Sequence, residues 1–313
     1  MTITSLPRRV HVRAPGKINV YFGVGEEGPD GYHTVASVYQ AVSLFEDVWV
    51  EESDGFRVSV DGSVDITDVP TDERNLALRA ARLVAAAADR TPRGVHVHIT
   101  KHVPVAGGMG GGSADAAASL LACDELWGTE LGSAGLQALA AQLGADVPFA
   151  LMGGTAVGVG RGDQLNPALA RGRMDWVIVP AAGLPTPAVY RRLDQLRHSP
   201  WGHEGADEPY VEPELLQSLR VGSAEQVADF VCNDLQIAAL DLRPELADIL
   251  KLGERSGALA GVVSGSGPTL VFLAASTPSA IDLQVTLSAA GFEALHAHGP
   301  VPGARVMSDL SVR

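Results

Sequence analysis

The chain has 313 residues, of which 46% are hydrophobic and 19% charged, and its formal net charge is −14. This length allows one large domain or two ordinary domains with a sizeable core. The excess of negative charge argues against a nucleic-acid backbone or an anionic membrane surface as the main partner.

The first hundred residues are rich in predicted strands. Alternation of apolar and polar residues predicts strands at 10–13, 18–24, 35–44, 48–52, 56–60 and 95–99. The segment 14–17 separates the first two predicted strands, and a turn-rich loop occupies 28–33. A run rich in Ala, Leu and Arg predicts a helix over 75–88.

A glycine-rich segment leads into the next predicted helix. Five glycines fill six positions from Gly107 to Gly112, and an alanine-rich run follows. We expect Ser113 to be the N-cap of this helix and Asp115 to lie in its first turn. A second helix is predicted over 133–143, with Gly144 as the residue after its C-cap.

The rest of the chain mixes both kinds of element. A strand at 153–160 precedes a predicted linker at 163–173, which divides the chain into domains 1–165 and 166–313. The later predicted strands are 176–180, 261–264, 269–273 and 293–297. The later predicted helices are 187–196, 214–220, 224–231, 244–253 and 279–290. This irregular alternation after a strand-rich start favours an α+β fold.

The amino terminus and the cysteines point to a cytoplasmic protein. No long apolar run follows Met1, so neither a signal peptide nor a membrane span is expected. Cys123 and Cys232 lack the spacing of a metal site and are expected to be buried thiols in a reducing compartment. Nothing in the sequence indicates an oligomeric state.

The glycine-rich segment has the properties of a phosphate site. Glycine lets backbone N–H groups approach a ligand closely, and a following helix offers free N–H groups at its positive end. The segment lacks the Gly-Lys-Ser/Thr of a Walker A loop, and only Gly108 and Gly110 imitate a dinucleotide-binding fingerprint. The motifs of protein kinases are absent. A flexible loop is the alternative, although such a loop seldom leads directly into a helix.

Five segments in a fixed order resemble a known family. Pro104–Asp115 resembles the ATP-binding motif of the GHMP small-molecule kinases. Ala14–Asn19 followed by Gly31–His33, and also Leu143–Phe149, are similar to signatures of the 4-diphosphocytidyl-2-C-methyl-D-erythritol kinase family within that superfamily. Gly265–Thr269 resembles the carboxy-terminal glycine motif of the superfamily.

The resemblance implies both a fold and a reaction. The fold would pair an amino-terminal domain like the second domain of ribosomal protein S5 with a ferredoxin-like carboxy-terminal domain. The reaction would be phosphorylation by ATP of the 2-hydroxyl of 4-diphosphocytidyl-2-C-methyl-D-erythritol, in the non-mevalonate isoprenoid pathway. The implied ATP-binding residues are Pro104, Val105, Ala106, Gly107, Gly108, Met109, Gly110, Gly111, Gly112, Ser113 and Ala114.

Two charged residues carry the expected chemistry. Asp146 can accept the proton of the substrate hydroxyl or orient that hydroxyl, because phosphoryl transfer depends mainly on positioning and charge neutralisation. We expect Pro148 to keep Val147 out of a helix and so to fix Asp146 in place. Lys17 can orient Asp146 and offset phosphate charge. An exposed lysine at a strand end and an aspartate in a turn are the structural alternatives.

The resemblance also implies a substrate site and a metal. Tyr32 and His33 would hold the cytidine, Asn19 would lie near the methylerythritol, and Thr186 and Tyr190 would lie near the same pocket. Phenylalanine is common in the family at the position of Tyr190. The alternative for Tyr32 and His33 is an ordinary surface loop.

Magnesium is expected with ATP, because the phosphate charges must be bridged during transfer. The Ser113 hydroxyl is the nearest candidate ligand, unless Ser113 serves only as an N-cap. His96 and His98 alternate on a strand and are expected to be ordinary polar-face residues. Another GHMP kinase of the homoserine or mevalonate type, a silent ligand sensor on the same fold and an NAD-dependent dehydrogenase are the alternative functions.

Overall fold

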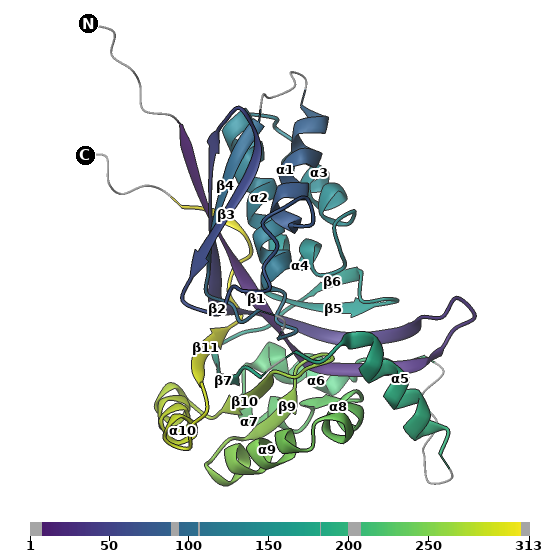
Figure 1. Ribbon diagram of the computed structural model, residues 1–313. Coiled ribbons are helices and arrows are strands. Elements are labelled where there is room, and N and C mark those ends of the chain that lie inside the picture. Colours follow the sequence, from purple (N-terminus) through teal and green to yellow (C-terminus); the bar gives the residue numbers. More distant parts are fainter. Residues whose placement is uncertain (1–7, 89–93, 106, 182, 200–207, 308–313) are drawn as a thin grey trace, which may run out of the picture.

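A computed structural model describes residues 8–88, 94–105, 107–181, 183–199 and 208–307. Figure 1 shows a larger sheet with α1 to α4 beside one of its faces, above a smaller sheet with its own helices. The mixture of helices and strands confirms the predicted α+β class. Both sheets contribute residues to the region that contains the predicted functional residues.

The larger sheet is built on one long hairpin. The strands β1 (Arg9–Glu27) and β2 (His33–Glu52) pair antiparallel, in the order β12-β1-β2-β4-β3. The other strands of this sheet are β3 (Gly55–Gly62), β4 (Gly94–Lys101), β5 (Thr155–Val159), β6 (Gln164–Ala168), β8 (Cys232–Asn233) and β12 (Arg305–Val306). The predicted interruption at 14–17 is wrong. A shift in register between Pro15 and Gly16 absorbs the irregular residues, so β1 continues through them.

Two helices cover this sheet and build its core. They are α1 (Leu76–Ala87), which Asn75 caps with its side chain, and α2 (Gly111–Trp127). Their alanines pack against valines of β1, β2 and β4. Because alanine is small, α2 lies close enough to the sheet for most of its residues to be buried. The predicted helix over 75–88 is therefore confirmed.

The start of α2 differs from the prediction. Gly110 is the N-cap, with φ 71°, and Ser113 is the third helical residue. The reason is that a glycine accepts the left-handed backbone conformation, so the first helical hydrogen bond already runs from the amide of Ala114 to the carbonyl of Gly110. Asp115 consequently lies beyond the first turn and is buried.

The following segment also corrects two predictions. Helix α3 (Gly132–Ala140) ends with Ala141 as its C-cap, so Gly144 does not terminate it. Val147 opens helix α4 (Val147–Met152). Pro148 does not prevent this, because the second position of a helix needs no backbone N–H. Asp146 is the N-cap of α4.

The smaller sheet has the strand order of a ferredoxin-like domain. Its strands are β7 (Met174–Val179), β9 (Ala260–Val263), β10 (Leu270–Ala274) and β11 (Leu295–Gly299), all antiparallel in the order β11-β7-β10-β9. The helices of this half are α5 (Thr186–Arg197), α6 (Pro213–Val221), α7 (Ala224–Ala228), α8 (Gln236–Leu242), α9 (Glu245–Arg255) and α10 (Thr277–Ala289). Helix α8 was not predicted.

The two halves are closely joined. One face of the smaller sheet, with Trp176 and Ile178, packs against β1 and β2. The Trp176 indole N–H donates to Gln40 Oε1 at 2.8 Å. The predicted linker at 163–173 contains β6, which pairs with β5, and β7 begins six residues after β6 ends. The division at residue 165 stays a prediction.

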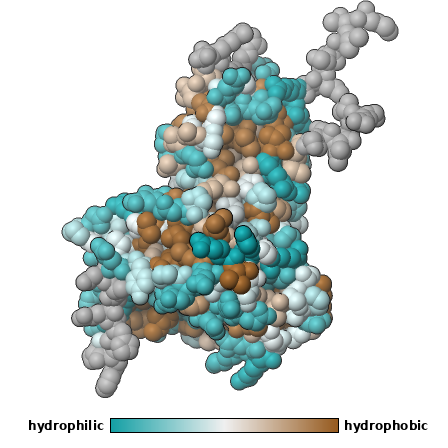
Figure 2. All heavy atoms as spheres, turned by 180° about the vertical axis from the view of Figure 1, so that it is seen from behind, coloured by the Kyte–Doolittle hydropathy of each residue, from teal (hydrophilic) through white to brown (hydrophobic). Residues whose placement is uncertain are grey.

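The surface of the described part carries apolar and hydrophilic residues side by side. Figure 2 shows this mixture on the face seen from behind. Among the described helices, none is long and apolar enough to cross a membrane. Cys123 is buried as predicted, whereas Cys232 is exposed, because it lies on the short strand β8 at the edge of β1.

Candidate functional site

The glycine-rich segment lines a cavity of about 390 Å³ at the start of α2. Since α2 begins at Gly111, the N–H groups of Gly111, Gly112 and Ser113 have no acceptor within the helix. The Lys17 amide donates to the Met109 carbonyl at 2.9 Å and fixes the segment to β1. The cavity therefore presents free N–H groups at the positive end of a helix, which suits a phosphate.

Close approach explains why the segment is glycine. A Cβ atom on Gly111 would lie 2.9 Å from Glu46 Oε1 and 3.2 Å from Lys101 Nζ. A Cβ atom on Gly110 would lie 3.2 Å from Lys17 Cγ, and its φ already favours glycine.

The structure places most of the predicted ATP-binding residues on this cavity. Its lining includes Pro104, Val105, Gly107, Gly108, Met109, Gly110, Gly111, Gly112 and Ser113. Ala114 is fully buried behind it, and Ala106 lies outside the described residues. The Ser113 side chain makes no hydrogen bond within the described part of the chain and lines the cavity.

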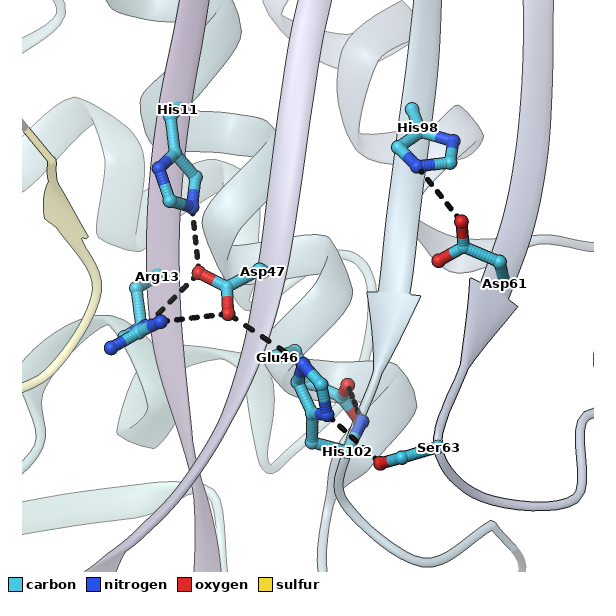
Figure 3. A network of polar contacts seen from close by, with 8 residues as sticks. All are labelled: His11, Arg13, Glu46, Asp47, Asp61, Ser63, His98 and His102. Carbon is cyan, nitrogen blue, oxygen red and sulfur yellow. Dashed lines mark hydrogen bonds and ion pairs between the residues drawn. The ribbon is translucent and has the colours of Figure 1, made fainter. Parts of the chain in front are cut away.

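Sequence reasoning missed a buried charged cluster beneath the segment. Lys101 Nζ lies 2.6 Å from Glu46 Oε1 and 2.7 Å from Asp115 Oδ2, and the three side chains are at most 5% exposed. Glu46 Oε2 also accepts the His102 amide at 2.9 Å, and Figure 3 shows the two residues together. Lys101 and Asp115 line the cavity. An available signal was the lysine at the end of a strand just before the glycines.

The cluster holds two acids and one base away from water. Burial and the Asp115 carboxylate raise the pKa of Glu46 to about 8. Burial also raises the pKa of Asp115. For Lys101, burial opposes the charged form, but both carboxylates outweigh it and raise the pKa. The lysine is therefore charged, and its two acids compete for it.

Lys17 and Asp146 lie together between the two halves of the molecule. Lys17 Nζ is 3.9 Å from Asp146 Oδ2, and the aspartate side chain is 33% exposed. Lys17 Nζ also donates to Asn19 Oδ1 at 2.9 Å, and Asn19 Nδ2 in turn donates to Ser37 Oγ at 2.7 Å. Asn19 is buried and orients the lysine, and it does not line the cavity of the other predicted substrate residues.

A second cavity, of about 410 Å³, collects the remaining predicted residues. Tyr32, His33, Thr186 and Tyr190 all line it. The rings of His33 and Tyr190 lie 5.0 Å apart, and Tyr32 is 56% exposed. Aromatic faces and a histidine around one cavity suit a flat heteroaromatic ligand.

Asp194 was missed by sequence reasoning and fixes the histidine of this cavity. His33 Nε2 lies 2.8 Å from Asp194 Oδ1. An ionised carboxylate only accepts, so Nε2 carries the proton and donates, which leaves Nδ1 as the nitrogen available to a ligand. Asp194 lies one helical turn after Tyr190 on α5, and it meets His33, at the start of β2, only in the folded structure.

A glycine turn from the smaller sheet links the two cavities. A Cβ atom on Gly108 would lie 3.2 Å from the Ser264 carbonyl, and one on Gly265 would lie 3.1 Å from Asn19 Oδ1. The Ser266 hydroxyl is 2.8 Å from the Thr186 hydroxyl. The turn therefore touches the phosphate cavity, the Lys17 neighbourhood and the aromatic cavity.

The histidines of β4 belong to a polar face of the larger sheet. Ser59 Oγ lies 2.8 Å from His96 and 2.9 Å from His98. Figure 3 shows the neighbouring network around Asp47, which accepts from Arg13 and lies 2.6 Å from His11. Within the described ranges, no three His, Cys, Asp or Glu residues are placed to hold a metal ion. His96 and His98 alternate along β4 with buried apolar residues, so they lie on the polar face of the sheet, as predicted.

The family comparisons agree with this geometry. Residues 75–154 match the model of the GHMP kinases N terminal domain, and residues 215–292 match GHMP kinases C terminal. A homoserine kinase from Cytophaga hutchinsonii has a TM-score of 0.73 at 19% identity, covering 98% of this chain and 100% of its own. That likeness shows the shared fold.

More similar relatives narrow the family. A 4-diphosphocytidyl-2-C-methyl-D-erythritol kinase of Leifsonia xyli subsp. xyli is 56% identical and covers 96% of this chain and 99% of its own. The enzyme of that name from Nocardia farcinica is 47% identical, and the match covers 99% of this chain and 100% of that enzyme. A crystal structure of 4-(cytidine 5'-diphospho)-2C-methyl-D-erythritol kinase is 32% identical, with a TM-score of 0.75. The match covers 92% of this chain and 98% of that chain. The chain belongs to the 4-diphosphocytidyl-2-C-methyl-D-erythritol kinase family of GHMP small-molecule kinases.

Proposed function

We propose that the chain transfers the γ-phosphoryl group of ATP to the 2-hydroxyl of 4-diphosphocytidyl-2-C-methyl-D-erythritol, a step of non-mevalonate isoprenoid synthesis. The names of its relatives support the reaction. The observation that carries it is the position of Lys17 and Asp146, which lie 3.9 Å apart beside both the glycine-rich segment and the turn that reaches the aromatic cavity. Donor and acceptor would meet there.

Asp146 is the base or orienting group in this proposal. A carboxylate with a third of its surface exposed can reach a bound hydroxyl and accept its proton as the phosphorus–oxygen bond forms. Lys17 is held by Asn19 and offsets the charge that accumulates on the transferred group.

The glycine-rich segment would hold the ATP phosphates through the free N–H groups of Gly111, Gly112 and Ser113. The Ser113 hydroxyl, free of other hydrogen bonds within the described residues, fits a ligand to the Mg²⁺ that accompanies ATP. Among the described residues, no three His, Cys, Asp or Glu side chains are placed to hold the ion, so the phosphates would supply most of its other ligands. When bound, Mg²⁺ neutralises phosphate charge.

The aromatic cavity would hold the cytidine. Tyr32 and Tyr190 offer ring faces for stacking, and His33 Nδ1 can accept a hydrogen bond from an exocyclic amine. Thr186 lies at the end of the cavity nearest the glycine turn and would contact the diphosphate side. The ATP-binding and catalytic part then lies within 1–165, and the region 166–313 completes the substrate cavity. A cytoplasmic location stays a prediction.

The test is ADP release from MgATP with four acceptor conditions. We expect ADP with 4-diphosphocytidyl-2-C-methyl-D-erythritol and none with homoserine, with mevalonate or without acceptor. Release with homoserine or mevalonate would instead favour another GHMP kinase activity. ATP binding without release in any condition would favour a ligand sensor. Competition by CDP against the acceptor checks that the nucleotide half is recognised.

A further inference from the structure

Arg161 contacts the ring of Tyr32 from a distant part of the chain. Its guanidinium carbon lies 3.9 Å from the centroid of the ring. Arg161 also lines the aromatic cavity. The residue sits in the turn between β5 and β6, and the Gly160 carbonyl in that turn accepts the Val35 amide at 2.8 Å. The turn is thereby attached to the start of β2, close to Tyr32.

Asp30 ties the arginine and the tyrosine together. Arg161 Nη2 donates to Asp30 Oδ2 at 2.7 Å, and the Tyr32 amide donates to Asp30 Oδ1 at 3.1 Å. One carboxylate therefore holds both the guanidinium and the backbone that carries the ring. The contact is specific in geometry, because a planar guanidinium stacks on a ring face.

Tyr32 needs such support. It is 56% exposed, and it follows the turn at Gly28–Gly31 between β1 and β2. A ring in this position loses rotational freedom when a flat ligand stacks on it, and that loss weakens binding unless the ring is already held. An aromatic ring has two faces, so a guanidinium on one face leaves the other for a ligand.

We propose that Arg161 is a positioning residue that covers one face of Tyr32 and presents the opposite face to the base of the cytidine substrate. This inference rests on the proposed function of the aromatic cavity. Arg161 acts through Tyr32 and does not itself touch the reacting atoms. Its interaction with Asp30 holds the guanidinium on the ring and offsets part of its charge.

The experiment measures CDP binding by isothermal titration calorimetry and steady-state kinetics on the full chain. Arg161→Ala should raise the Kd of CDP and the KM of the cytidine substrate about two- to fivefold, the size of an exposed cation–π contact. The kcat and the KM of ATP should not change. For Arg161→Lys, the Kd of CDP should lie between the values for the unchanged protein and for Arg161→Ala, since an ammonium keeps the charge but not the planar face.

A double substitution tests whether Arg161 acts through Tyr32. In a Tyr32→Ala background, Arg161→Ala should change CDP binding no further. Arg82→Ala is the matched control, because Arg82 covers the Phe56 ring at 4.6 Å and pairs with Glu73, and none of these three residues lines either cavity. That control should bind CDP and ATP like the unchanged protein.

Three results would overturn the proposal. They are unchanged CDP binding in Arg161→Ala, tighter CDP binding in Arg161→Ala, or an equal loss in the Tyr32→Ala background. Tighter binding would mean that Arg161 occupies the position of the base, and an equal loss would mean a direct charge contact. Failure of the unchanged protein to bind CDP would instead contradict the proposed function itself. Thermal melting of each variant confirms that it is folded.

Discussion

The two cavities are built from different parts of the polypeptide. The phosphate cavity is lined mainly by the glycine-rich segment, together with residues of the stretch 68–76 and the buried Lys101 and Asp115. The aromatic cavity is lined by side chains from a turn, a hairpin and helix α5, and its aromatic residues are partly exposed. A backbone site offers no side chain to exchange and fails when its conformation changes. A side-chain site can lose one contact at a time, with smaller effects.

The largest effect should come from the residue that lies between the cavities. Asp146→Asn removes the proton acceptor but keeps the size of the side chain, so kcat should fall about 10²- to 10⁴-fold. The Kd of ATP should stay the same, because Asp146 does not line the phosphate cavity. Single-turnover kinetics and nucleotide titration measure the two quantities. Near-normal turnover would remove Asp146 from the chemistry.

A substitution in the backbone site should have the next largest effect. Gly110→Ala puts a Cβ atom 3.2 Å from Lys17 Cγ at a φ of +71°, so both the segment and the lysine must move. A shift of this kind should lower kcat/KM for ATP about 100-fold.

Gly128→Ala is the matched control for Gly110→Ala. It lies at the other end of α2 with φ +61° and has nothing within 4 Å of an added Cβ atom. It should lose stability by a similar amount, about 1 kcal/mol, with normal kinetics. If both variants have the same kinetics, the conformation of the segment does not matter for ATP.

A single contact of the side-chain site should matter less. Asp194→Asn exchanges a charge-assisted hydrogen bond to His33 for a neutral one, and should raise the KM of the cytidine substrate about tenfold with an unchanged KM of ATP. The KM of the cytidine substrate in the His33→Ala variant should not rise further when Asp194→Asn is added. Asp241→Asn removes a similar carboxylate that pairs with Arg192 elsewhere on α5, and serves as the control. Equal changes in both KM values would indicate a structural role.

The smallest effect concerns the pH dependence of stability. The pKa of Glu46 is raised to about 8, so the folded chain keeps a proton that the unfolded chain has already lost. The free energy of unfolding therefore falls as the pH rises from the ordinary value of about 4.5 towards about 8. Glu46→Gln fixes the uncharged form, so the Tm of this variant relative to the Tm of the unchanged protein should rise as the pH increases over this range. Parallel Tm curves would show that the acid is not perturbed.

The same difference between the cavities decided what the sequence could predict. The glycine-rich part of the phosphate cavity was predictable, because its residues are contiguous and glycine has a distinctive backbone. The residues of 68–76 that also line the cavity were not predicted. The buried charged cluster beneath the glycine-rich segment was not predictable, since Glu46 comes from β2 and meets Lys101 only because β2 pairs with β4. Asp194 and Arg161 reach the aromatic cavity by tertiary packing alone.

Local errors had local causes. Ser113 was predicted as the N-cap because serine is a good cap, but Gly110 can take a left-handed conformation and starts the helix earlier. The break at 14–17 was predicted from Pro15 and Gly16, and a shift in register absorbed it.

The strand that carries Lys17 depends on the end of the chain. Strand β1 pairs with β8 through Tyr21 and Cys232 and with β12 through Val12 and Val306, and Gly154 donates to the Val301 carbonyl. The ribosome adds roughly 5–20 residues per second, so strand β1 waits many seconds for these partners. Until residue 306 has emerged, the edge of β1 stays open and is exposed to pairing with other chains. This edge of the larger sheet is therefore expected to be completed only after residue 306 has been synthesised.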